Sequence, residues 1–324
     1  MRTFTIILAA ALAALSLSAC GGAAQASSPD REPARTIRVE SYDGELNPIE
    51  VALPYAPERL AVLDLPALDI LDNLGLGDHV VGVAKGNSVD FLRDYMADDA
   101  IRNLGTIKEA DLEAIMSAEP DVIFIGSRLA AQYDTLRRIA PVIMLRTDPE
   151  AGVLASTRKN AETVATLFGL ENEVEAKLAG YVTRIETLKA AAAGQSAVLG
   201  ITTGGAFNTL GNDGRLSLIS REIGFDNLTA ADTTASHGNE ASFELLVKLN
   251  PDYLFILDRD AAIAAEGAQL ARDIIENELV KKTAAFQNGR IVYLNQPDIW
   301  YTAEGGITAL HLMLQDLEGV LLTD

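Results

Sequence analysis

The chain has 324 residues, of which 48% are hydrophobic and 6% aromatic, and its formal net charge at pH 7 is −20. This length leaves room for two domains, and the composition excludes a disordered or fibrous protein. The negative charge argues against nucleic acid as a partner, because a polyanion would be repelled. An anionic ligand would need a local cluster of basic side chains.

The first residues have the pattern of an export signal. Arg2 gives a positive start, and residues 4–17 form an apolar stretch that is short for a membrane span. The sequence Leu-Ser-Ala-Cys that follows ends at Cys20, the single cysteine, and resembles the bacterial lipobox, in which this cysteine is lipidated. The alternative is an ordinary signal peptide, but the exported protein would then keep a free thiol. We therefore expect a lipoprotein signal peptide (1–19), a flexible tether (20–35), and an exported protein anchored to a membrane on the periplasmic or cell-surface side.

Residues 36–168 predict an N-terminal lobe in which strands and helices alternate. The turn Asp43-Gly44 joins the first two strands as a hairpin, and proline and glycine residues separate later elements. We expect strands over 36–39, 49–53, 59–63, 79–83, 122–125 and 141–145, and helices over 67–74, 108–117 and 157–169.

Residues 169–194 predict a long linking helix, in which only Gly180 interrupts a run of helix formers with apolar residues at helical spacing. A C-terminal lobe follows over residues 195–324. Its expected strands are 197–202, 253–257 and 291–294, and its expected helices are 216–223, 268–276 and 306–322. The alternation in both halves indicates an α/β fold with two Rossmann-like lobes and mostly parallel sheets, joined by one backbone helix.

One segment of each lobe has the same pattern. Residues 111–129 (DLEAIMSAEPDVIFIGSRL) and 242–260 (SFELLVKLNPDYLFILDRD) both contain a short amphipathic helix, a Pro-Asp pair, an apolar strand and an arginine. The helix ends there because the residue before a proline is pushed out of the α region. The apolar run suits a strand that is buried on both faces. Each copy therefore places an arginine, Arg128 or Arg259, beyond the carboxyl end of a strand, where open α/β sheets bind ligands.

A third arginine, Arg215, lies in a glycine-rich loop that leads into a predicted helix. A guanidinium stays charged and offers planar donors, so Arg128, Arg215 and Arg259 would bind an anion strongly if they met in one cleft. The alternative for each arginine is a surface ion pair, which contributes little.

His237 and Tyr301 are candidate metal ligands. His237 lies in a polar loop beside a glycine that leaves room for close approach, although an isolated loop histidine is more often solvated. Tyr301 lies in an expected loop before a glycine pair, where aromatic residues usually serve packing, but a phenolate also suits ferric iron. His79 and His311 are predicted to be structural or surface residues.

Common enzyme signatures are absent from the sequence, namely the GxSxG elbow, HExxH and the phosphate loop GxxxxGK[ST]. The pair Gly204-Gly205 follows a strand, but its spacing does not fit a dinucleotide fingerprint. Three scattered histidines make a poor zinc site. We expect a binding protein without an intrinsic cofactor rather than an enzyme; a secreted enzyme with His237, Glu240 and Glu244 as acid and base groups is the distant alternative.

The chain resembles the periplasmic ferric-siderophore-binding lipoproteins of iron ABC importers, in particular the catecholate/petrobactin-type subgroup. The motifs that carry the resemblance are 204–215 (GGAFNTLGNDGR), 236–244 (SHGNEASFE), 250–260 (NPDYLFILDRD), 279–283 (LVKKT) with 288–294 (NGRIVYL), and 300–306 (WYTAEGG). The similarity extends from about residue 36 to the end. It implies a class III, chelatase-like binding protein with a helical backbone and a shallow cleft between the lobes, and we expect a monomer.

The resemblance also implies roles for the candidate residues. In such proteins three arginines form the floor of the cleft, and these would be Arg128, Arg215 and Arg259. A histidine and a tyrosine complete the shell of iron held by a tetradentate catecholate, and these would be His237 and Tyr301. A ferric tris-catecholate carries about three negative charges, which three arginines would offset.

Family members also dock on arginines of the permease through one surface glutamate per lobe. Glu113 and Glu244 lie at matching points of the two repeats. The alternative is a first-turn carboxylate that the helix dipole favours, and both explanations can hold together. We therefore expect the substrate-binding component of an ABC importer that captures a ferric siderophore, with a haem, cobalamin or metal-ion binding protein of the same fold as the alternative.

Overall fold

The structure is a computed structural model, and it describes residues 35–87, 89–231, 237–265 and 267–322. The predicted signal peptide, Cys20 and all of the tether except Arg35 lie outside the described residues. Within the described ranges, no helix combines the length and the apolar character that crossing a membrane requires.

The described chain begins with a β-hairpin, as predicted. Strands β1 (Thr36–Tyr42) and β2 (Pro48–Pro54) pair antiparallel. In the turn, Oδ1 of Asp43 accepts hydrogen bonds from two backbone N–H groups, each at 2.9 Å. The left-handed position of the turn belongs to Leu46 (φ 66°) and not to Gly44.

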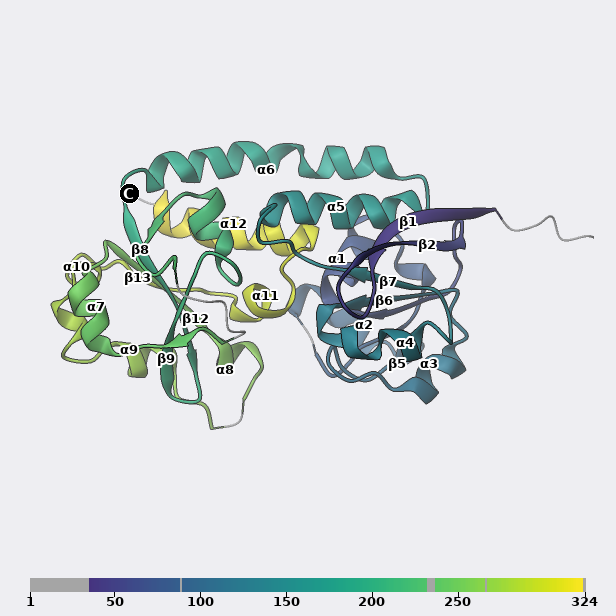
Figure 1. The fold of residues 1–324 in the computed structure, drawn as a ribbon, viewed down its shortest axis with the longest axis horizontal. Coiled ribbons are helices and arrows are strands. Elements are labelled where there is room, and N and C mark those ends of the chain that lie inside the picture. Colours follow the sequence, from purple (N-terminus) through teal and green to yellow (C-terminus); the bar gives the residue numbers. More distant parts are fainter. Residues whose placement is uncertain (1–34, 88, 232–236, 266, 323–324) are drawn as a thin grey trace, which may run out of the picture. The chain divides into compact units, whose positions relative to one another are not determined.

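The first sheet consists of five parallel strands: β3 (Leu60–Leu63), β4 (Val80–Val83), β5 (Arg102–Asn103), β6 (Val122–Gly126) and β7 (Val142–Leu145). They lie in the order β5-β4-β3-β6-β7. The helices of this part are α1 (Leu65–Asn73), α2 (Arg93–Ala97), α3 (Leu112–Ala118), α4 (Tyr133–Leu136) and α5 (Val153–Thr166). Because helices cover the sheet (Figure 1), β3 and β6 are buried on both faces.

The second sheet is mixed. Its strands are β8 (Ser196–Thr203), β9 (Ala206–Leu210), β10 (Asp226–Asn227), β11 (Asn239–Glu240), β12 (Tyr253–Asp258) and β13 (Ile291–Tyr293). The order is β11-β9-β8-β12-β13, with β10 beside β8. Strand β9 pairs antiparallel with both β8 and β11, and the other pairs are parallel. The helices are α7 (Phe243–Leu249), α8 (Arg259–Ala262), α9 (Ala271–Ile275), α10 (Ala284–Gln287), α11 (Pro297–Thr302) and α12 (Ile307–Leu321).

The prediction did not include β9, because the glycines before it read as a loop. Gly204 (φ 57°) and Gly205 (φ 80°) form a two-residue turn between β8 and β9. Two successive residues with positive φ give the primed hairpin turn that matches the strand twist. The predicted helix over 216–223 is instead a five-residue π-helical turn, Leu218–Glu222.

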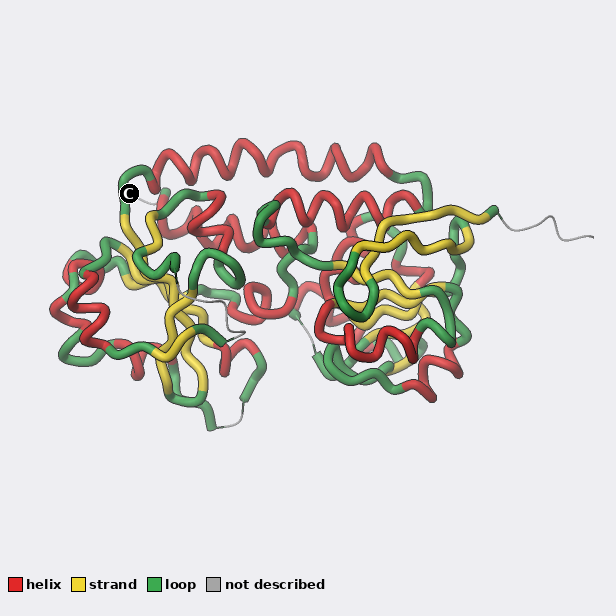
Figure 2. The backbone as a smooth tube through the Cα atoms, in the orientation of Figure 1, coloured by secondary structure: helices red, strands yellow, loops and turns green. Residues whose placement is uncertain are grey.

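The predicted linking helix is present as α6 (Glu171–Ala192). It packs along α5 and α12 (Figures 1 and 2), and Val174, Leu178, Ile185 and Leu188 form its buried stripe. Arg184 of α6 donates to both carboxylate oxygens of a glutamate of α12, at 2.6 and 2.8 Å. The lobe boundaries at 168 and 194 remain a prediction.

The two copies of the repeat have nearly the same backbone. Helix α3 ends at Glu119 (φ 46°, ψ 57°) and α7 at Asn250 (φ 45°, ψ 57°), both in the left-handed region. The predicted helix end before the proline is therefore confirmed, and its conformation is left-handed rather than extended. The next aspartates, Asp121 and Asp252, each accept a 2.9 Å hydrogen bond from a backbone N–H at the start of the neighbouring parallel strand. These bonds fix the strand that delivers each arginine.

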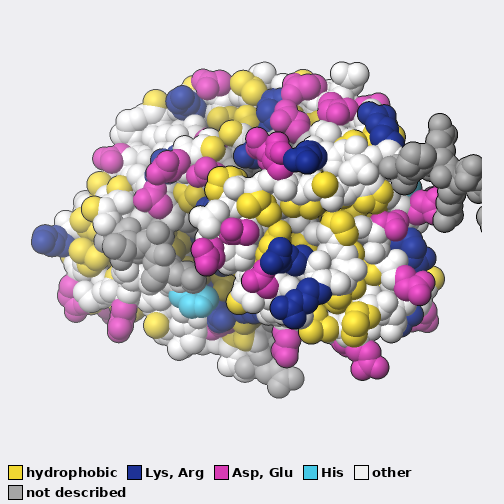
Figure 3. Space-filling view, turned by 45° about the vertical axis from the view of Figure 1, so that its right-hand side comes forward, with side chains coloured by type: hydrophobic (Ala, Val, Ile, Leu, Met, Phe, Trp, Pro, Cys, Tyr) yellow, Lys and Arg dark blue, Asp and Glu magenta, His cyan; other side chains and the backbone are white. Residues whose placement is uncertain are grey.

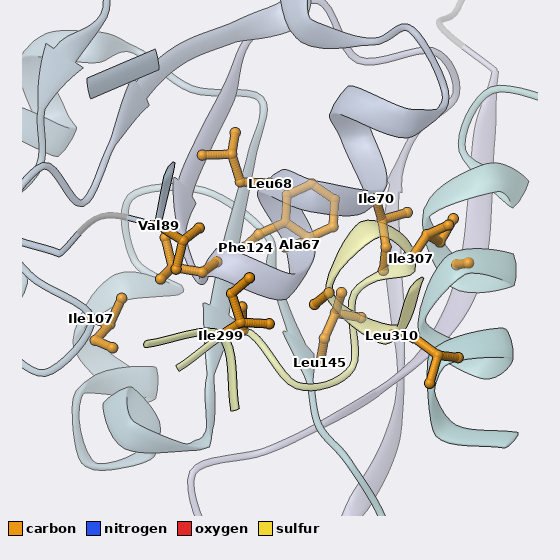
Figure 4. Packing of buried hydrophobic residues seen from close by; sticks show 14 of the residues in the cluster. Ala67, Leu68, Ile70, Val89, Ile107, Phe124, Leu145, Ile299, Ile307 and Leu310 are labelled. Carbon is orange, nitrogen blue, oxygen red and sulfur yellow. The ribbon is translucent and has the colours of Figure 1, made fainter. Parts of the chain in front are cut away.

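Helix α11 packs its apolar side into the core of the first sheet. Ile299 of α11 lies among Val89, Ile107 and Phe124 (Figure 4), and all four belong to one buried cluster. The same helix contacts α8, α12 and β12 of the second half of the chain, so it links the core of the first sheet to elements of the second half. The short helix is therefore held rigidly, and so are the two aromatic residues that follow Ile299.

Candidate anion-binding site

Tyr301 lies on the helix α11, whereas the sequence predicts a loop at this position. Pro297 in the first turn favours a helix start, because the missing N–H would lack a helical partner there anyway. The indole Nε1 of Trp300 donates to Oδ2 of Asp316 on α12 at 3.0 Å, which anchors the helix. Tyr301 is 5% exposed. A loop prediction was wrong here because six residues are too few for helical periodicity to be visible.

Three guanidinium groups surround the ring of Tyr301. The Cζ atom of Arg215 lies 4.2 Å from the ring centroid, and those of Arg128 and Arg259 lie 5.8 Å from it. The arginines come from the ends of β6 and β12 and from a loop of the second sheet. At these distances each cation is attracted by the face of the aromatic ring. The structure thus brings the three predicted arginines together.

Two of the arginines also make hydrogen bonds to Tyr301. Nη2 of Arg128 donates to the carbonyl of Tyr301 at 2.9 Å, and Nε of Arg259 donates to its Oη at 3.1 Å. Arg259 also donates to Thr203 and forms an ion pair with Asp260, each at 3.2 Å. These bonds fix both the backbone and the phenol oxygen of the tyrosine.

Arg215 is the most deeply placed of the three. Burial lowers the pKa of its guanidinium, and the nearby charges of Arg128 and Arg259 act in the same direction. A guanidinium nevertheless stays protonated at any pH of interest. The site therefore holds like charges close together, an arrangement that favours an anion between them.

A polar cavity of about 200 Å³ lies against Arg128, Arg215 and Tyr301. Its other charged lining residues are Arg146, Asp64 and Glu304, and neutral polar groups of Thr147 and Asn160 complete it. Burial raises the pKa of Asp64 to about 6 and that of Glu304 to about 7. This volume suits a small group, so a large chelate would lie outside the cavity.

His237 follows the segment 232–236, which lies outside the described residues. Its side chain is exposed, and its carbonyl accepts a 2.7 Å hydrogen bond from Nδ2 of Asn208 on β9. Gly238 has φ 74°, and a Cβ there would lie 2.5 Å from a backbone oxygen of β9, so the turn requires glycine. Partial burial lowers the pKa of His237, and the charges of Arg259 and Arg215 lower it further. The imidazole is therefore neutral at pH 7, the form that binds metals.

The other histidines have structural contacts. Nδ1 of His79 lies 3.0 Å from the carbonyl of Pro57, and its ring packs edge-on against Phe168. His311 lies 2.9 Å from Arg184 on α6. In the described ranges, no three His, Cys, Asp or Glu residues are grouped as a metal site would require.

Glu113 and Glu244 are exposed in the first turns of α3 and α7. Both positions are accessible to a partner. On the face drawn in Figure 3, a histidine lies beside basic side chains, and acidic side chains are scattered around them. Cys20 lies outside the described residues.

Sequence reasoning missed the carboxyl groups of the site. Asp64 follows β3 directly, and Asp260 follows Arg259, so both stand at strand ends where ligand sites form. Glu304 lies two residues beyond the end of α11, so helical spacing gives no signal for it. The signals for the two aspartates were present in the sequence but weak.

The comparisons with known proteins identify the family. The family model described as "Periplasmic binding protein" matches residues 60–297. The chain belongs to the periplasmic binding protein family. Among the relatives of this binding protein is the petrobactin-binding protein YclQ of Bacillus subtilis (strain 168), 29% identical over 320 residues and 98% of each chain.

Solved structures of similar proteins have the same fold. The structure of YclQ matches this periplasmic binding protein with a TM-score of 0.82, covering 90% of this chain and 100% of YclQ. The catecholate-siderophore binding protein VctP of Vibrio cholerae matches with a TM-score of 0.79 and 31% identity, covering 88% and 100%. PiuA, the iron uptake ABC transporter substrate-binding protein of Streptococcus pneumoniae Canada MDR_19A, matches with a TM-score of 0.80 and 28% identity, covering 89% and 99%. The predicted fold class, a class III periplasmic binding protein, is confirmed.

Proposed function

We propose that the chain is the substrate-binding component of an ABC importer, which captures a ferric siderophore of the catecholate type and delivers it to the permease. The observation that carries this proposal is the meeting of Arg128, Arg215 and Arg259 around Tyr301. The names of YclQ and VctP add support, since they specify petrobactin and catecholate siderophores. A chain with a net charge of −20 repels anions elsewhere on its surface, so the cluster localises an anionic chelate.

The charge of the ligand matches the cluster. A ferric tris-catecholate carries about three negative charges, and each charge pair in a partly buried site interacts several times more strongly than in water. Guanidinium groups also donate in planar pairs to catecholate oxygens. A neutral chelate would leave the repulsion among the three arginines uncompensated.

Capture is tested with the fluorescence of Trp300, the only tryptophan of the chain and the neighbour of Tyr301. A ferric catecholate added to the mature protein should quench this fluorescence and reach saturation at one chelate per chain. The chelate should then be recovered unchanged, because a binding protein captures stoichiometrically whereas an enzyme converts its substrate. No quenching by any catecholate, hydroxamate or citrate complex of iron would contradict the proposal.

We further propose that His237 and Tyr301 complete the iron shell when the siderophore supplies only four oxygen atoms. The neutral imidazole and the phenol oxygen, which already accepts a bond from Arg259, provide the two remaining donors. With a ferric bis-catecholate, Tyr301→Phe and His237→Ala should each shift the charge-transfer band of the bound complex. With a hexadentate tris-catecholate the same variants should leave the band in place, and a band that never responds would show that neither residue touches iron.

For delivery, we propose that Glu113 and Glu244 dock on the permease. Glu113→Ala or Glu244→Ala should lower siderophore uptake by about five-fold, about 1 kcal/mol of docking free energy, because each removes one exposed charge pair. Trp300 quenching should be unchanged in both variants. Normal uptake with the double variant would exclude this role.

We also propose that this importer component is anchored to the membrane by lipidation of Cys20. Cys20→Ser should release the mature protein from the membrane fraction, and the mass of the wild-type chain should include diacylglycerol. A wild-type chain of unmodified mass would contradict anchoring without affecting the binding proposal.

A further inference from the structure

Each arginine of the cluster interacts electrostatically with a nearby carboxyl group. Arg259 forms an ion pair with Asp260, and the charge of Arg128 acts on Asp64, whose pKa it lowers against the effect of burial. Both aspartates are also used by the fold. Asp260 accepts a backbone hydrogen bond at 2.6 Å, and Asp64 caps α1 through a backbone bond at 3.2 Å. Both carboxyl groups therefore stabilise the local backbone in addition to interacting with an arginine.

Glu304 is the carboxyl group that interacts with Arg215. Unlike the two aspartates, it has a buried oxygen that accepts no hydrogen bond from the described part of the chain. Its Oε2 is out of contact with solvent and, among the described residues, has no hydrogen-bond partner. Burial raises the pKa of Glu304 to about 7, whereas the charges of Arg215 and Arg128 lower it and that of Glu222 raises it further. Glu304 lines the cavity behind Tyr301. Its position inside the cluster gives its charge a direct effect on the arginines.

We propose that Glu304 determines the charge selectivity of the site, because its ionised carboxylate cancels part of the positive charge that the arginines present to a ligand. Coulomb energy is proportional to the product of the charges, so this carboxylate opposes a trianion more than a dianion and leaves a neutral chelate unaffected. Of the other charged groups that line the cavity, Arg146 keeps its positive charge, and Asp64, whose pKa burial raises to about 6, ionises at a lower pH than Glu304. The inference rests on the proposed function, since it specifies the ligand charge that the same site accepts.

The test uses one hexadentate tris-catechol ligand loaded with Fe³⁺ or with Ti⁴⁺. The two complexes have nearly the same shape, but the first carries three negative charges and the second two. At pH 9, about two units above the pKa of Glu304, Glu304→Gln should tighten the ferric complex by about ten-fold and the titanium complex by about five-fold, in proportion to charge. At pH 6 both gains should disappear, because the wild-type carboxyl group is then protonated.

Glu186→Gln is the matched control. Glu186 lies exposed on α6 and pairs only with Lys189 in the described structure, at 3.8 Å, so this variant makes the same change in net charge away from the cavity. It should leave both affinities unchanged. Asp64→Asn keeps a residue that can cap α1 and should act in the same direction as Glu304→Gln.

Equal changes for the two complexes, or gains that persist at pH 6, would overturn the inference, since a packing effect depends on neither ligand charge nor pH. If Glu304→Gln does not fold, the double variant Asp64→Asn/His237→Ala still decides, because it removes the other titrating groups near the arginines. Its preference for the ferric over the titanium complex should fall about two-fold from pH 6 to pH 9, and a constant preference would refute the role. A wild-type protein that binds neither complex would overturn the proposed function as well. Binding with an unaltered preference would overturn this inference alone.

Discussion

The two copies of the helix–strand repeat share a backbone but use their arginines differently. Helices α3 and α7 end in the same left-handed conformation, and the strands after them deliver Arg128 and Arg259 to the same tyrosine. Arg128 donates to the backbone carbonyl of Tyr301, whereas Arg259 donates to its phenol oxygen. The arginine of the first copy therefore fixes the backbone of α11, and the arginine of the second copy orients the phenol oxygen that we propose as an iron ligand.

This difference shows how a repeated unit acquires two roles. The backbone conformation of the repeat determines where a cation emerges from each sheet. The chain that surrounds it determines what the cation binds. Asp260 next to Arg259 has no acidic counterpart in the first copy, where Leu129 follows Arg128. The carboxylate of Asp260 therefore reduces the net positive charge at the second arginine, and no adjacent residue does so at the first.

Alanine variants of Arg259 and Arg128 should differ in how they change ligand affinity and the free energy of unfolding. Arg259→Ala should weaken a ferric tris-catecholate by about 100-fold, about 3 kcal/mol, because Asp260 and the ligand both lose their cation. Arg128→Ala should weaken binding and also lower the free energy of unfolding, since the carbonyl of Tyr301 loses its donor. Fluorescence titration and urea unfolding measure the two quantities.

The control for this comparison is Arg272→Ala, an exposed arginine on α9 paired with Glu276 at 2.6 Å, which should change neither quantity much. If Arg259→Ala reduced the affinity for a neutral ferric trihydroxamate as much as for the trianion, the arginine would be structural.

A second comparison concerns the aspartates that begin the repeated strands. Asp121→Ala removes acceptors of two backbone N–H groups at 2.9 Å, and Asp252→Ala removes the acceptor of a backbone N–H and a hydroxyl of Ser196. Each should lower the free energy of unfolding by about 1–2 kcal/mol in urea. A loss in only one copy would show that the equivalence of their backbones has no energetic meaning.

The contribution of Asp252 should also depend on pH. Hydrogen bonds from the backbone and side chain of Ser196 lower its pKa below the ordinary 3.8. A lowered pKa in the folded state stabilises the protein above pH 4, and this stabilisation is lost as the pH falls through the folded-state pKa. The difference between wild type and Asp252→Ala should therefore shrink below pH 4, and a difference that grows there would contradict this assignment.

The smallest effect is expected at the left-handed helix ends. Glu119→Gly should raise the free energy of unfolding by about 0.5–1 kcal/mol, because glycine adopts positive φ without strain. Asn250→Gly should not stabilise, since Oδ1 of Asn250 accepts a 2.8 Å hydrogen bond from the backbone of Ala284 that glycine cannot replace. Thermal unfolding of both variants checks the difference, and equal gains would show that this side-chain bond contributes nothing.

Much of the fold could be predicted because its signals are local. The hairpin, the linking helix and the strands β6 and β12 follow from hydrophobic period and from turn residues. Helix α11 could not be predicted, since it is one and a half turns long and is held by Ile299 in the core of the other sheet. Such a helix is stabilised by tertiary packing rather than by its own sequence.

The site could be predicted in part for a related reason. Strand ends in an α/β sheet indicate where side chains gather, so Arg128 and Arg259 could each be expected at the carboxyl edge of their own sheet. The position of Arg215 depends on a loop with a left-handed residue, Leu216 (φ 65°), which leaves no pattern in sequence. The carboxyl group of Glu304 could not be assigned, because the cavity that it lines is built from residues far apart in the sequence, from Asp64 to Thr302.

The central claim is that one anionic ferric chelate lies against all three arginines. A crystal structure of the mature protein with a ferric tris-catecholate, phased at the iron absorption edge, tests it most directly. We expect a single iron peak beside the side chain of Tyr301, with catecholate oxygens in hydrogen-bond contact with Arg128, Arg215 and Arg259. An iron peak elsewhere on the protein, or guanidinium groups that turn away from the chelate, would contradict it.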